Sequence, residues 1–326
     1  MTASRRHFLK IAFGTVTTAA APALGHAQSY PSRPVKIIVP FGPGGPPDVI
    51  ARLMAQRLSQ ETGQQFVIEN LPGGGGNTGT VAAARAPADG YTLLAISGGF
   101  FVNPSFHARA PYDPANDFAP VSLVASTPNI IVVHPTFPAK TLREMIDLVK
   151  ANPGKYSYGH ASTGSMSHLS GELLKLRFGL DLVTVPFNAG PQAAASVIGG
   201  HTPIAFTSLP TMVPSVKEGK VRALAVTRPE RTPTVPDVPT MAEAGAPDQE
   251  AETLLGLVAP TGTPPDIIAH LYREIVKATA HPEVHQRLTA LGYEPLAMTP
   301  EVLAGKIKSE VEKWGKVIRD ANIRIN

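Results

Sequence analysis

The chain has 326 residues, of which 43% are hydrophobic and 17% charged, and its net charge is +4. It contains no cysteine, which excludes disulfides, zinc–cysteine sites, iron–sulfur clusters and thiol catalysis. The small net charge gives no indication of a nucleic-acid-binding surface.

Residues 1–27 predict an export signal. The pair Arg5-Arg6 precedes an uncharged segment rich in alanine and threonine, a pattern typical of twin-arginine signals. Small residues at Gly25 and Ala27 predict cleavage after Ala27. A buried N-terminal helix or a basic surface arm is the alternative for this segment. We expect a periplasmic protein without a membrane anchor, because the apolar segment is short for a bilayer and no cysteine is available to carry a lipid.

The rest of the chain alternates short apolar runs with segments of helical periodicity. The predicted strands are 35–39, 66–69, 92–96, 130–133, 156–158, 182–185, 204–206 and 223–226. Apolar residues at helical spacing predict helices that include 50–58, 142–149, 169–174, 267–275 and 303–318. This alternation predicts α/β layers with mainly parallel sheets. Four prolines in 228–239 predict an extended surface path and a candidate domain boundary.

Three glycine-rich loops are candidate ligand sites. Loop 40–48 joins the first strand to the first helix, at the edge of an α/β sheet where ligands bind, and a helix start favours an anion. A tight strand-to-helix turn is the alternative. Loop 72–79 follows the second strand. In loop 159–168, three hydroxyl residues could donate hydrogen bonds to an anion, with a plain helix cap as the alternative.

The sequence gives little support for catalysis or metal binding. No nucleophile elbow and no paired carboxylates occur at a predicted strand end, so we expect neither an enzyme nor a cofactor. His281 and His285 have the spacing of two metal ligands on a helix, but no third ligand is evident, so we expect a surface pair and no metal site. His168 either lines a ligand site or caps its own turn.

The chain resembles the Bug family, the TctC-type extracytoplasmic receptors of tripartite tricarboxylate transporters, over essentially its full mature length. The matching blocks are Tyr30-Pro31-Ser32-Arg33-Pro34, Pro40-Phe41-x-Pro43-Gly44-Gly45-x-x-Asp48, Glu69-Asn70-x-Pro72-Gly73-x-Gly75-Gly76-Asn77, Asp89-Gly90-Tyr91-Thr92-Leu93-Leu94, Pro111-Tyr112-Asp113-Pro114-x-x-Asp117-Phe118-Ala119-Pro120, Gly164-x-x-x-His168-Leu169, Lys220-Val221-Arg222-Ala223-Leu224-Ala225-Val226-Thr227 and Pro236-Asp237-Val238-Pro239-Thr240.

The resemblance implies a type II periplasmic-binding-protein fold, in which two α/β lobes are joined by two crossing strands with a ligand cleft between them. Residues 28–127 and 228–326 would form lobe 1, and residues 128–227 would form lobe 2. The expected ligand is a small organic carboxylate: a dicarboxylate, a hydroxy acid or an aromatic carboxylate. The expected ligand-binding residues are Phe41, Gly44, Gly45, Pro46, Asp48, Gly98, Thr163, Gly164, Ser165, His168, Phe187, Asn188, Thr207 and Ser208.

The resemblance also implies a monomer that delivers its ligand to an inner-membrane permease made of one large and one small subunit. There are two alternatives. One is a receptor that presents its ligand to a membrane sensor, and the other is an exported hydrolase or isomerase.

Several positions depart from the usual family pattern. Pro46-Pro47 stand where members commonly have a small residue and a threonine, and Thr207 stands where many have an acidic residue. Phe100-Phe101 and His160 also replace smaller or polar residues. These departures predict a less polar or aromatic carboxylate.

Overall fold

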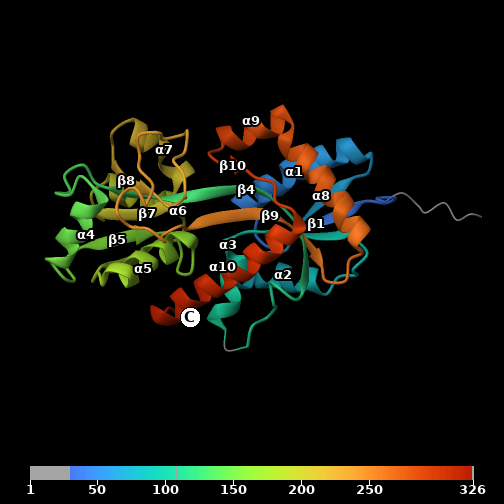
Figure 1. Ribbon diagram of the computed structural model, residues 1–326, viewed down its shortest axis with the longest axis horizontal. Helices are drawn as coiled ribbons and strands as arrows, with labels where there is room; N and C mark the ends of the chain where they lie inside the picture. Colours follow the sequence, from blue (N-terminus) through green and yellow to red (C-terminus); the bar gives the residue numbers. More distant parts are fainter. Residues whose placement is uncertain (1–29, 108, 325–326) are drawn as a thin grey trace, which may run out of the picture.

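The computed structural model describes residues 30–107 and 109–324, so the predicted export signal lies outside the described residues. The chain forms two α/β lobes along one curled sheet (Figure 1). The strands are β1 Val35–Val39, β2 Phe66–Asn70, β3 Thr92–Ile96, β4 Phe118–Val133, β5 Ser157–His160, β6 Val183–Pro186, β7 Ile204–Ser208, β8 Arg222–Val226, β9 Glu252–Pro260 and β10 Glu294–Pro295.

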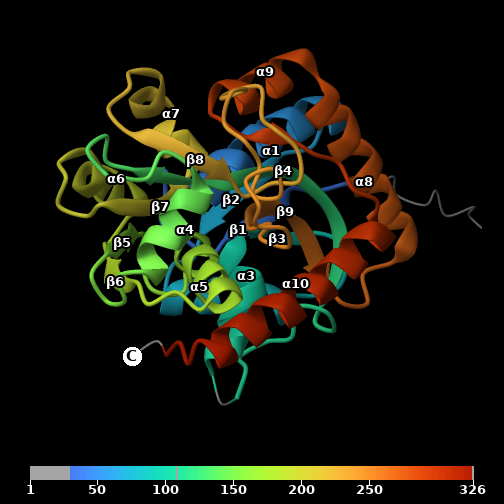
Figure 2. The ribbon, with the colours of Figure 1, turned by 60° about the vertical axis from the view of Figure 1, so that its left-hand side comes forward.

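Helices flank this sheet on both faces (Figure 2). The α-helices are α1 Pro46–Thr62, α2 Asn77–Ala84, α3 Gly98–Val102, α4 Leu142–Lys150, α5 Met166–Phe178, α6 Gly190–Ile198, α7 Leu209–Lys217, α8 Pro265–Ala280, α9 Pro282–Ala290 and α10 Pro300–Asp320. Two short 3₁₀ segments, η1 Gly74–Gly76 and η2 Asn103–Phe106, lie beside α2 and α3 in the chain. None of the helices that the structure describes is long and apolar enough to cross a membrane.

The strand order is β2-β1-β3-β9-β4-β7-β5-β6, with β8 and β10 also paired to β4. Among the strands named above, the parallel pairs are β1–β2, β1–β3, β5–β6 and β5–β7. Both β4 and β9 run antiparallel to all of their partners. The prediction of mainly parallel sheets is therefore wrong at the centre of the molecule, because each return of the chain between the lobes inserts a strand of opposite direction.

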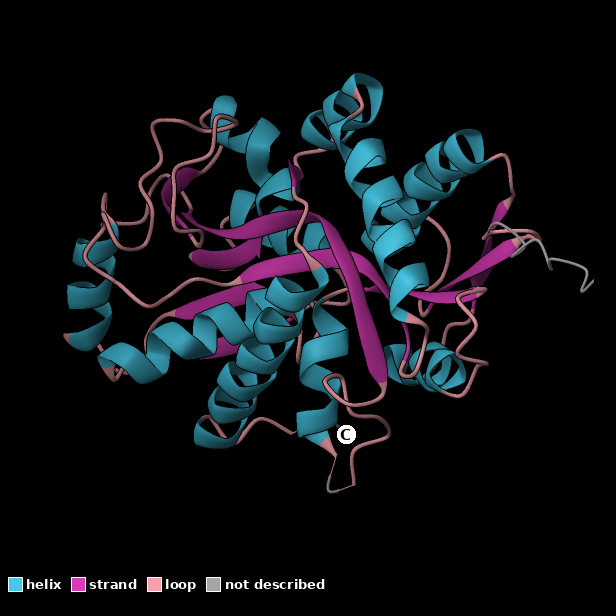
Figure 3. Cartoon of the chain, turned by 45° about the vertical axis from the view of Figure 1, so that its right-hand side comes forward, coloured by secondary structure: helices cyan, strands magenta, loops and turns pink. Residues whose placement is uncertain are grey.

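Strand β4 belongs to both lobes, and Figure 3 shows the long strands that pass between them. Its residues 118–128 pair with β9, and from Asn129 onward it pairs with β7 and β8. Pro128, which has no N–H to give to a ladder, stands next to the point where the partners change. We retain 127/128 and 227/228 as proposed lobe boundaries, and this change of partner supports the first of them.

Three buried residues tie the two crossings together beside this point. The Thr227 hydroxyl accepts a hydrogen bond from the Asn129 N–H at 2.9 Å and donates one to the Ala251 carbonyl at 2.8 Å. The Asn129 side-chain amide donates to the same carbonyl at 2.9 Å. Because buried polar groups are costly to leave unpaired, this arrangement fixes where the chain passes between the lobes.

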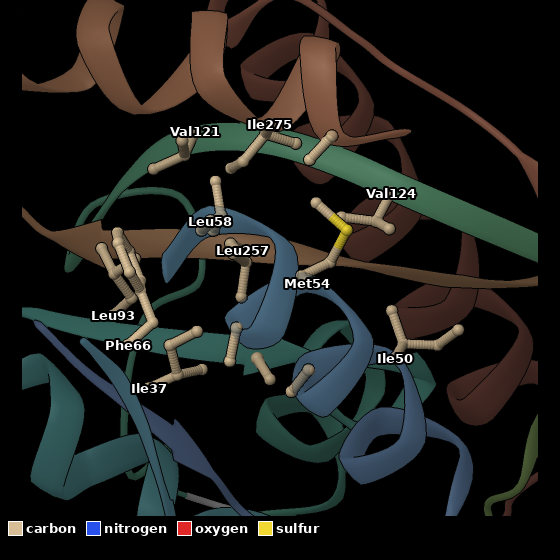
Figure 4. Packing of buried hydrophobic residues seen from close by; sticks show 14 of the residues in the cluster. Ile37, Ile50, Met54, Leu58, Phe66, Leu93, Val121, Val124, Leu257 and Ile275 are labelled. Atoms are coloured by element: carbon tan, nitrogen blue, oxygen red, sulfur yellow. The ribbon is translucent and has the colours of Figure 1, made fainter. Parts of the chain in front are cut away.

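Four apolar clusters hold the layers together. In lobe 1, α1, α8 and α9 cover one face of the sheet, where Met54 and Leu58 of α1 lie in one cluster with Ile37 of β1 and Leu257 of β9 (Figure 4). Helices α2, α3 and α10 cover the opposite face. In lobe 2, α4 and α5 cover one face, and α6 and α7 cover the other. Helix α10 also packs against α5, so it contacts both lobes.

The proline-rich segment 228–239 differs from its prediction. Val235 and Val238 are buried and join the apolar cluster beneath α6 and α7. Arg228 forms an ion pair with Glu294 at 2.9 Å. The segment is not extended, since it forms consecutive turns in which the Val235 N–H donates to the Thr232 carbonyl at 3.2 Å and the Val238 N–H donates to the Val235 carbonyl at 3.1 Å. These turns bring both valines against lobe 2.

Candidate functional site

A cavity of about 530 Å³ lies between the two lobes. A volume of this size suits a small organic ligand. Lobe 1 lines it with the loop between β1 and α1, with η1 and with the start of α3, and lobe 2 lines it with the loop that leads into α5. The lining residues are Phe41, Gly45, Pro46, Pro47, Gly75, Ser97, Gly98, Gly99, Asn103, Ser162, Thr163, Gly164, Ser165, Met166 and Thr253.

The buried carboxylate of Asp48 shapes the lobe 1 loop. It accepts hydrogen bonds from the Gly44 N–H at 2.9 Å, the Arg52 Nε at 2.9 Å and the Asn70 amide at 2.8 Å. The Asn70 amide also donates to the Phe41 carbonyl at 3.0 Å. Burial alone raises the pKa of Asp48, but the hydrogen bonds from Arg52, Gly44 and Asn70 outweigh it and lower that pKa to about 2. Asp48 is therefore ionised in the folded protein and holds the loop between β1 and α1 in place.

Two consecutive prolines begin α1 at the wall of the cavity. Pro46 and Pro47 occupy the first helical positions after Gly45. A helix normally presents unpaired N–H groups in its first turn, but proline has none. The start of α1 is therefore poor in hydrogen-bond donors, as the sequence predicted from this pair.

The lobe 2 wall is, by contrast, rich in donors. Ser165 caps α5, and its hydroxyl accepts a hydrogen bond from the His168 N–H at 3.3 Å. Helix geometry provides no intrahelical acceptor for the N–H groups of Met166 and Ser167 in the same turn. The Thr163 side chain is exposed beside them. These groups suit an anion, because α5 has no acidic residue in its first turn.

His168 supports this loop from behind. Its Nδ1 accepts a hydrogen bond from the Gly164 N–H at 3.1 Å, and its ring stacks on the buried His160 ring with centroids 4.3 Å apart. Tyr158 and Glu172 lie beside the pair, and the Tyr158 hydroxyl donates to Glu172 at 2.7 Å. His168 thus both caps its turn and holds Gly164 in place.

The histidine pair predicts a loss of stability in acid. Burial, followed by the proximity of His168, lowers the pKa of His160 to about 4. Between pH 6.5 and 4 the unfolded chain therefore binds a proton at His160 that the folded chain does not, so stability falls as the pH falls through this range, by about 3 kcal/mol in all. We expect His160→Phe to flatten this part of a denaturant-unfolding profile. His201→Phe, at an exposed position of the same lobe, is the control. Equal acid slopes in the wild type and His160→Phe would contradict this assignment.

The lobes touch at the floor of the cavity. A Cβ added to Gly98 would lie 2.8 Å from Cγ of Met166, so the two lobes are in contact there. The ring of Phe41 packs over Gly76, where a Cβ would lie 3.0 Å from its Cζ. Glycine at these positions therefore allows Phe41 and Met166 to approach the backbone of lobe 1.

The structure brings one group of the predicted ligand-binding residues together at the cavity. These are Phe41, Gly45, Pro46, Gly98, Thr163, Gly164 and Ser165. Gly44, Asp48 and His168 lie directly behind the lining and support its loops.

The other four predicted residues lie outside this lining. Phe187 lines a separate pocket of lobe 2, and Asn188 is exposed next to it in the chain. Thr207 is buried close to Gly190 at the start of α6, and the Ser208 hydroxyl hydrogen-bonds that of Thr211 at 2.8 Å. Their role in ligand binding stays a prediction.

Phe100, Phe101 and His160 do not face the cavity either. Phe100 packs edge-to-face against Phe101 and Phe118 in the core of lobe 1. Of the departures that predicted a less polar ligand, only the two prolines line the site.

Sequence reasoning did not select several lining residues. The glycine-rich loop 72–79 did indicate Gly75, whose carbonyl accepts a hydrogen bond from the Asn103 amide at 2.8 Å. Asn103 and Thr253 carry no local motif, since only the packing of η2 and β9 brings them to the cavity. No group of three or more metal-binding side chains occurs in residues 30–107 and 109–324.

The sequence matches the family described as the tripartite tricarboxylate transporter family receptor over residues 50–323. One relative is the protein BugT of Bordetella pertussis, which is 36% identical over 312 residues, covering 95% of this chain and 96% of BugT.

Two similar structures contain ligands. One is an R. palustris protein with adipate, with 34% identity and a TM-score of 0.76 over 90% of this chain and 99% of that one. The other is MatC from Rhodopseudomonas palustris with bound malate, with 34% identity and a TM-score of 0.73 over 89% of this chain and 100% of that one. Their likeness to this chain extends over both lobes and confirms the predicted periplasmic-binding-protein fold. The chain therefore belongs to the family of tripartite tricarboxylate transporter receptors, and it is a periplasmic solute-binding protein rather than an enzyme.

Proposed function

We propose that this receptor captures a small organic carboxylate in the cavity between its lobes and delivers it to an inner-membrane permease made of one large and one small subunit. The observation that carries the proposal is the start of α5, where the helix cap Ser165 and the first helical residue Met166 line a cavity between two lobes. The adipate and malate complexes of the two R. palustris proteins support the ligand class.

The energy of such binding is adequate without a basic side chain. Hydrogen bonds to a charged group contribute about 1.5–3 kcal/mol each, and a helix N-terminus adds about 0.3–1 kcal/mol. Two or three such bonds, after the cost of association, are compatible with micromolar affinity, about −8 kcal/mol. The donor-rich wall of lobe 2 can provide them.

A thermal-shift screen of the exported protein tests the ligand class. The panel consists of dicarboxylates, hydroxy acids, aromatic carboxylates and amino acids. A true ligand at a hundredfold excess over its Kd stabilises the protein by about 2.7 kcal/mol. A shift of the melting temperature with another solute class, and none with any carboxylate, would overturn the proposal.

We also propose that residues 1–27 are a twin-arginine signal, that cleavage leaves Gln28 as the first residue, and that the exported protein is a monomer. N-terminal sequencing of protein recovered from the periplasm tests the cleavage, and light scattering tests the monomer. Copurification with the large and small permease subunits, dependent on ligand, tests delivery.

A further inference from the structure

The contact between His168 and the cavity lining depends on where the imidazole proton lies. The Gly164 N–H donates to Nδ1 of His168 at 3.1 Å, and Gly164 lines the cavity. A ring nitrogen that accepts a hydrogen bond carries no proton, so the proton of the neutral ring is on Nε2. Nε2 faces Oε1 of Glu172 at 3.9 Å. The hydrogen bond to the lining loop therefore exists only while Nδ1 is unprotonated.

The environment of His168 keeps its ring neutral at pH 7. Its residue is 5% exposed, and burial lowers the pKa of His168 below its usual value. Glu172 on the same helix raises this pKa and Lys175 lowers it. Because the Lys175 Nζ also donates to Glu172 Oε1 at 2.8 Å, these two charges largely offset each other. His168 therefore gains a proton only as the pH falls below about 6.5.

The neighbouring strands place no further charge against the ring at neutral pH. His160 of β5 is fully buried, and its ring stacks on that of His168. Burial lowers the pKa of His160 to about 4, so this ring stays neutral above pH 5. Tyr158 of β5 and Thr184 of β6 donate to Glu172 at 2.7 and 3.3 Å. His168 is thus the group of this cluster that titrates in mild acid.

Protonation of Nδ1 would direct a new N–H at the N–H of Gly164. Two donors cannot bond to each other, so Gly164 would lose its acceptor and move away from the ring. The other contacts of this loop do not titrate in the same range, since the Ser167 hydroxyl accepts from the Ala161 N–H at 3.2 Å. The result is a displaced lining at an intact helix start.

A bound carboxylate would itself attract a proton to His168, which opposes this effect. That attraction acts through Gly164 and is reduced by the Glu172 carboxylate beside Nε2. The lost hydrogen bond, by contrast, lies in direct contact with the cavity lining. We therefore expect the loss of the contact to outweigh the attraction.

We propose that His168 is a positioning residue whose protonation controls ligand binding. The neutral ring holds Gly164 in the binding conformation, and the protonated ring releases it, so the affinity for a carboxylate falls in mild acid. This inference rests on the proposed function, because it concerns the regulation of the same site.

Calorimetric titration of the exported protein at pH 7.5 and pH 5 tests this control. Adipate, malate and benzoate are the probes, and each is titrated into the wild type and into His168→Asn. Asparagine has Oδ1 where histidine has Nδ1, and it does not titrate. The titration of the probe itself is the same for both proteins and cancels in the ratio. We expect acid to weaken binding to the wild type about threefold or more beyond its effect on the variant.

Equal effects of acid on the two proteins, or a smaller effect on the wild type, would overturn the inference and leave the proposed function intact. Failure of every carboxylate in the thermal-shift panel, with these three probes included, to bind at pH 7.5 would overturn both.

His168→Phe tests the hydrogen bond apart from the proton. It has no acceptor at any pH, so we expect its affinity at pH 7.5 to fall about 2- to 10-fold, the equivalent of one hydrogen bond, and to be partly regained in His168→Asn. His201→Asn, at an exposed position of the same lobe outside the cavity lining, is the matched control and should keep the acid response of the wild type. Full affinity in His168→Phe would overturn the inference.

A titration of the wild type requires no variant. The ring resonances of His168 are followed by NMR against pH, with and without a saturating concentration of the probe that binds. If binding favours the unprotonated ring, reciprocity requires the titration midpoint of His168 to lie at lower pH in the complex. A midpoint that is unchanged or higher in the complex would overturn the inference.

Discussion

Replacement of Met166 by proline is expected to weaken carboxylate binding by about 10- to 100-fold, the equivalent of one lost hydrogen bond to a charged group. Met166 is the first residue of α5, and Ser165 before it has φ −66° and ψ 159°. Proline is well tolerated at the first helical position after a residue of this conformation. The substitution therefore deletes one N–H donor while keeping the helix start.

The control is Met166→Ala. Both variants lack the thioether that contacts Gly98, but only the proline variant lacks the N–H. Affinity is measured by calorimetry on folded protein, with the thermal unfolding midpoint of each variant recorded alongside. If the alanine and proline variants bind with the same affinity, the N–H of residue 166 is not a ligand contact.

Replacement of Asp48 by alanine is expected to destabilise the protein by about 2 kcal/mol, because hydrogen bonds to a charged group contribute about 1.5–3 kcal/mol each and the partners of Asp48 are partly open to water. The Asp48 side chain is 3% exposed, and its loss leaves the Gly44 N–H, the Arg52 Nε–H and one N–H of the Asn70 amide without their acceptor. Because the same carboxylate holds the lining loop, ligand affinity should fall as well. Urea unfolding at neutral pH measures the first effect and calorimetry the second.

Asp147→Ala is the matched control. Asp147 accepts from the Arg143 Nε at 3.1 Å with the same i, i+4 spacing as Asp48 and Arg52, but its side chain is 56% exposed. Exposed pairs of this kind contribute about 0–1 kcal/mol. The folded-state pKa of Asp48 lies below its unfolded value, so its contribution is present above about pH 4 and is lost as the pH falls toward 2. If Asp48→Ala and Asp147→Ala lose the same free energy of unfolding at neutral pH, Asp48 does not hold the loop in place.

Local pattern was sufficient for much of the fold. Strands β1 and β3 were predicted with their observed ends, since short apolar runs bounded by glycine and proline identify buried strands. Strand β4 was predicted only over its last residues, and β9 was missed. Both are buried on both faces over most of their length, so their residues show no alternation. Their length and antiparallel direction follow from pairing between distant segments.

From the sequence alone, loops 40–48, 72–79 and 159–168 could be selected as candidate ligand sites, because glycine, proline and hydroxyl residues at the end of a strand have local conformational consequences. The sequence also determined the donor-poor start of α1, since a proline lacks its N–H in any fold. Which residues share the cavity depends on the packing of the two lobes. Asn103 and Thr253 are brought there by the packing of η2 and β9, whereas Phe100, Phe101 and His160 are withdrawn into the cores of their lobes. The physical reason is that burial and contact between lobes depend on the pairing of distant segments, which no local pattern specifies.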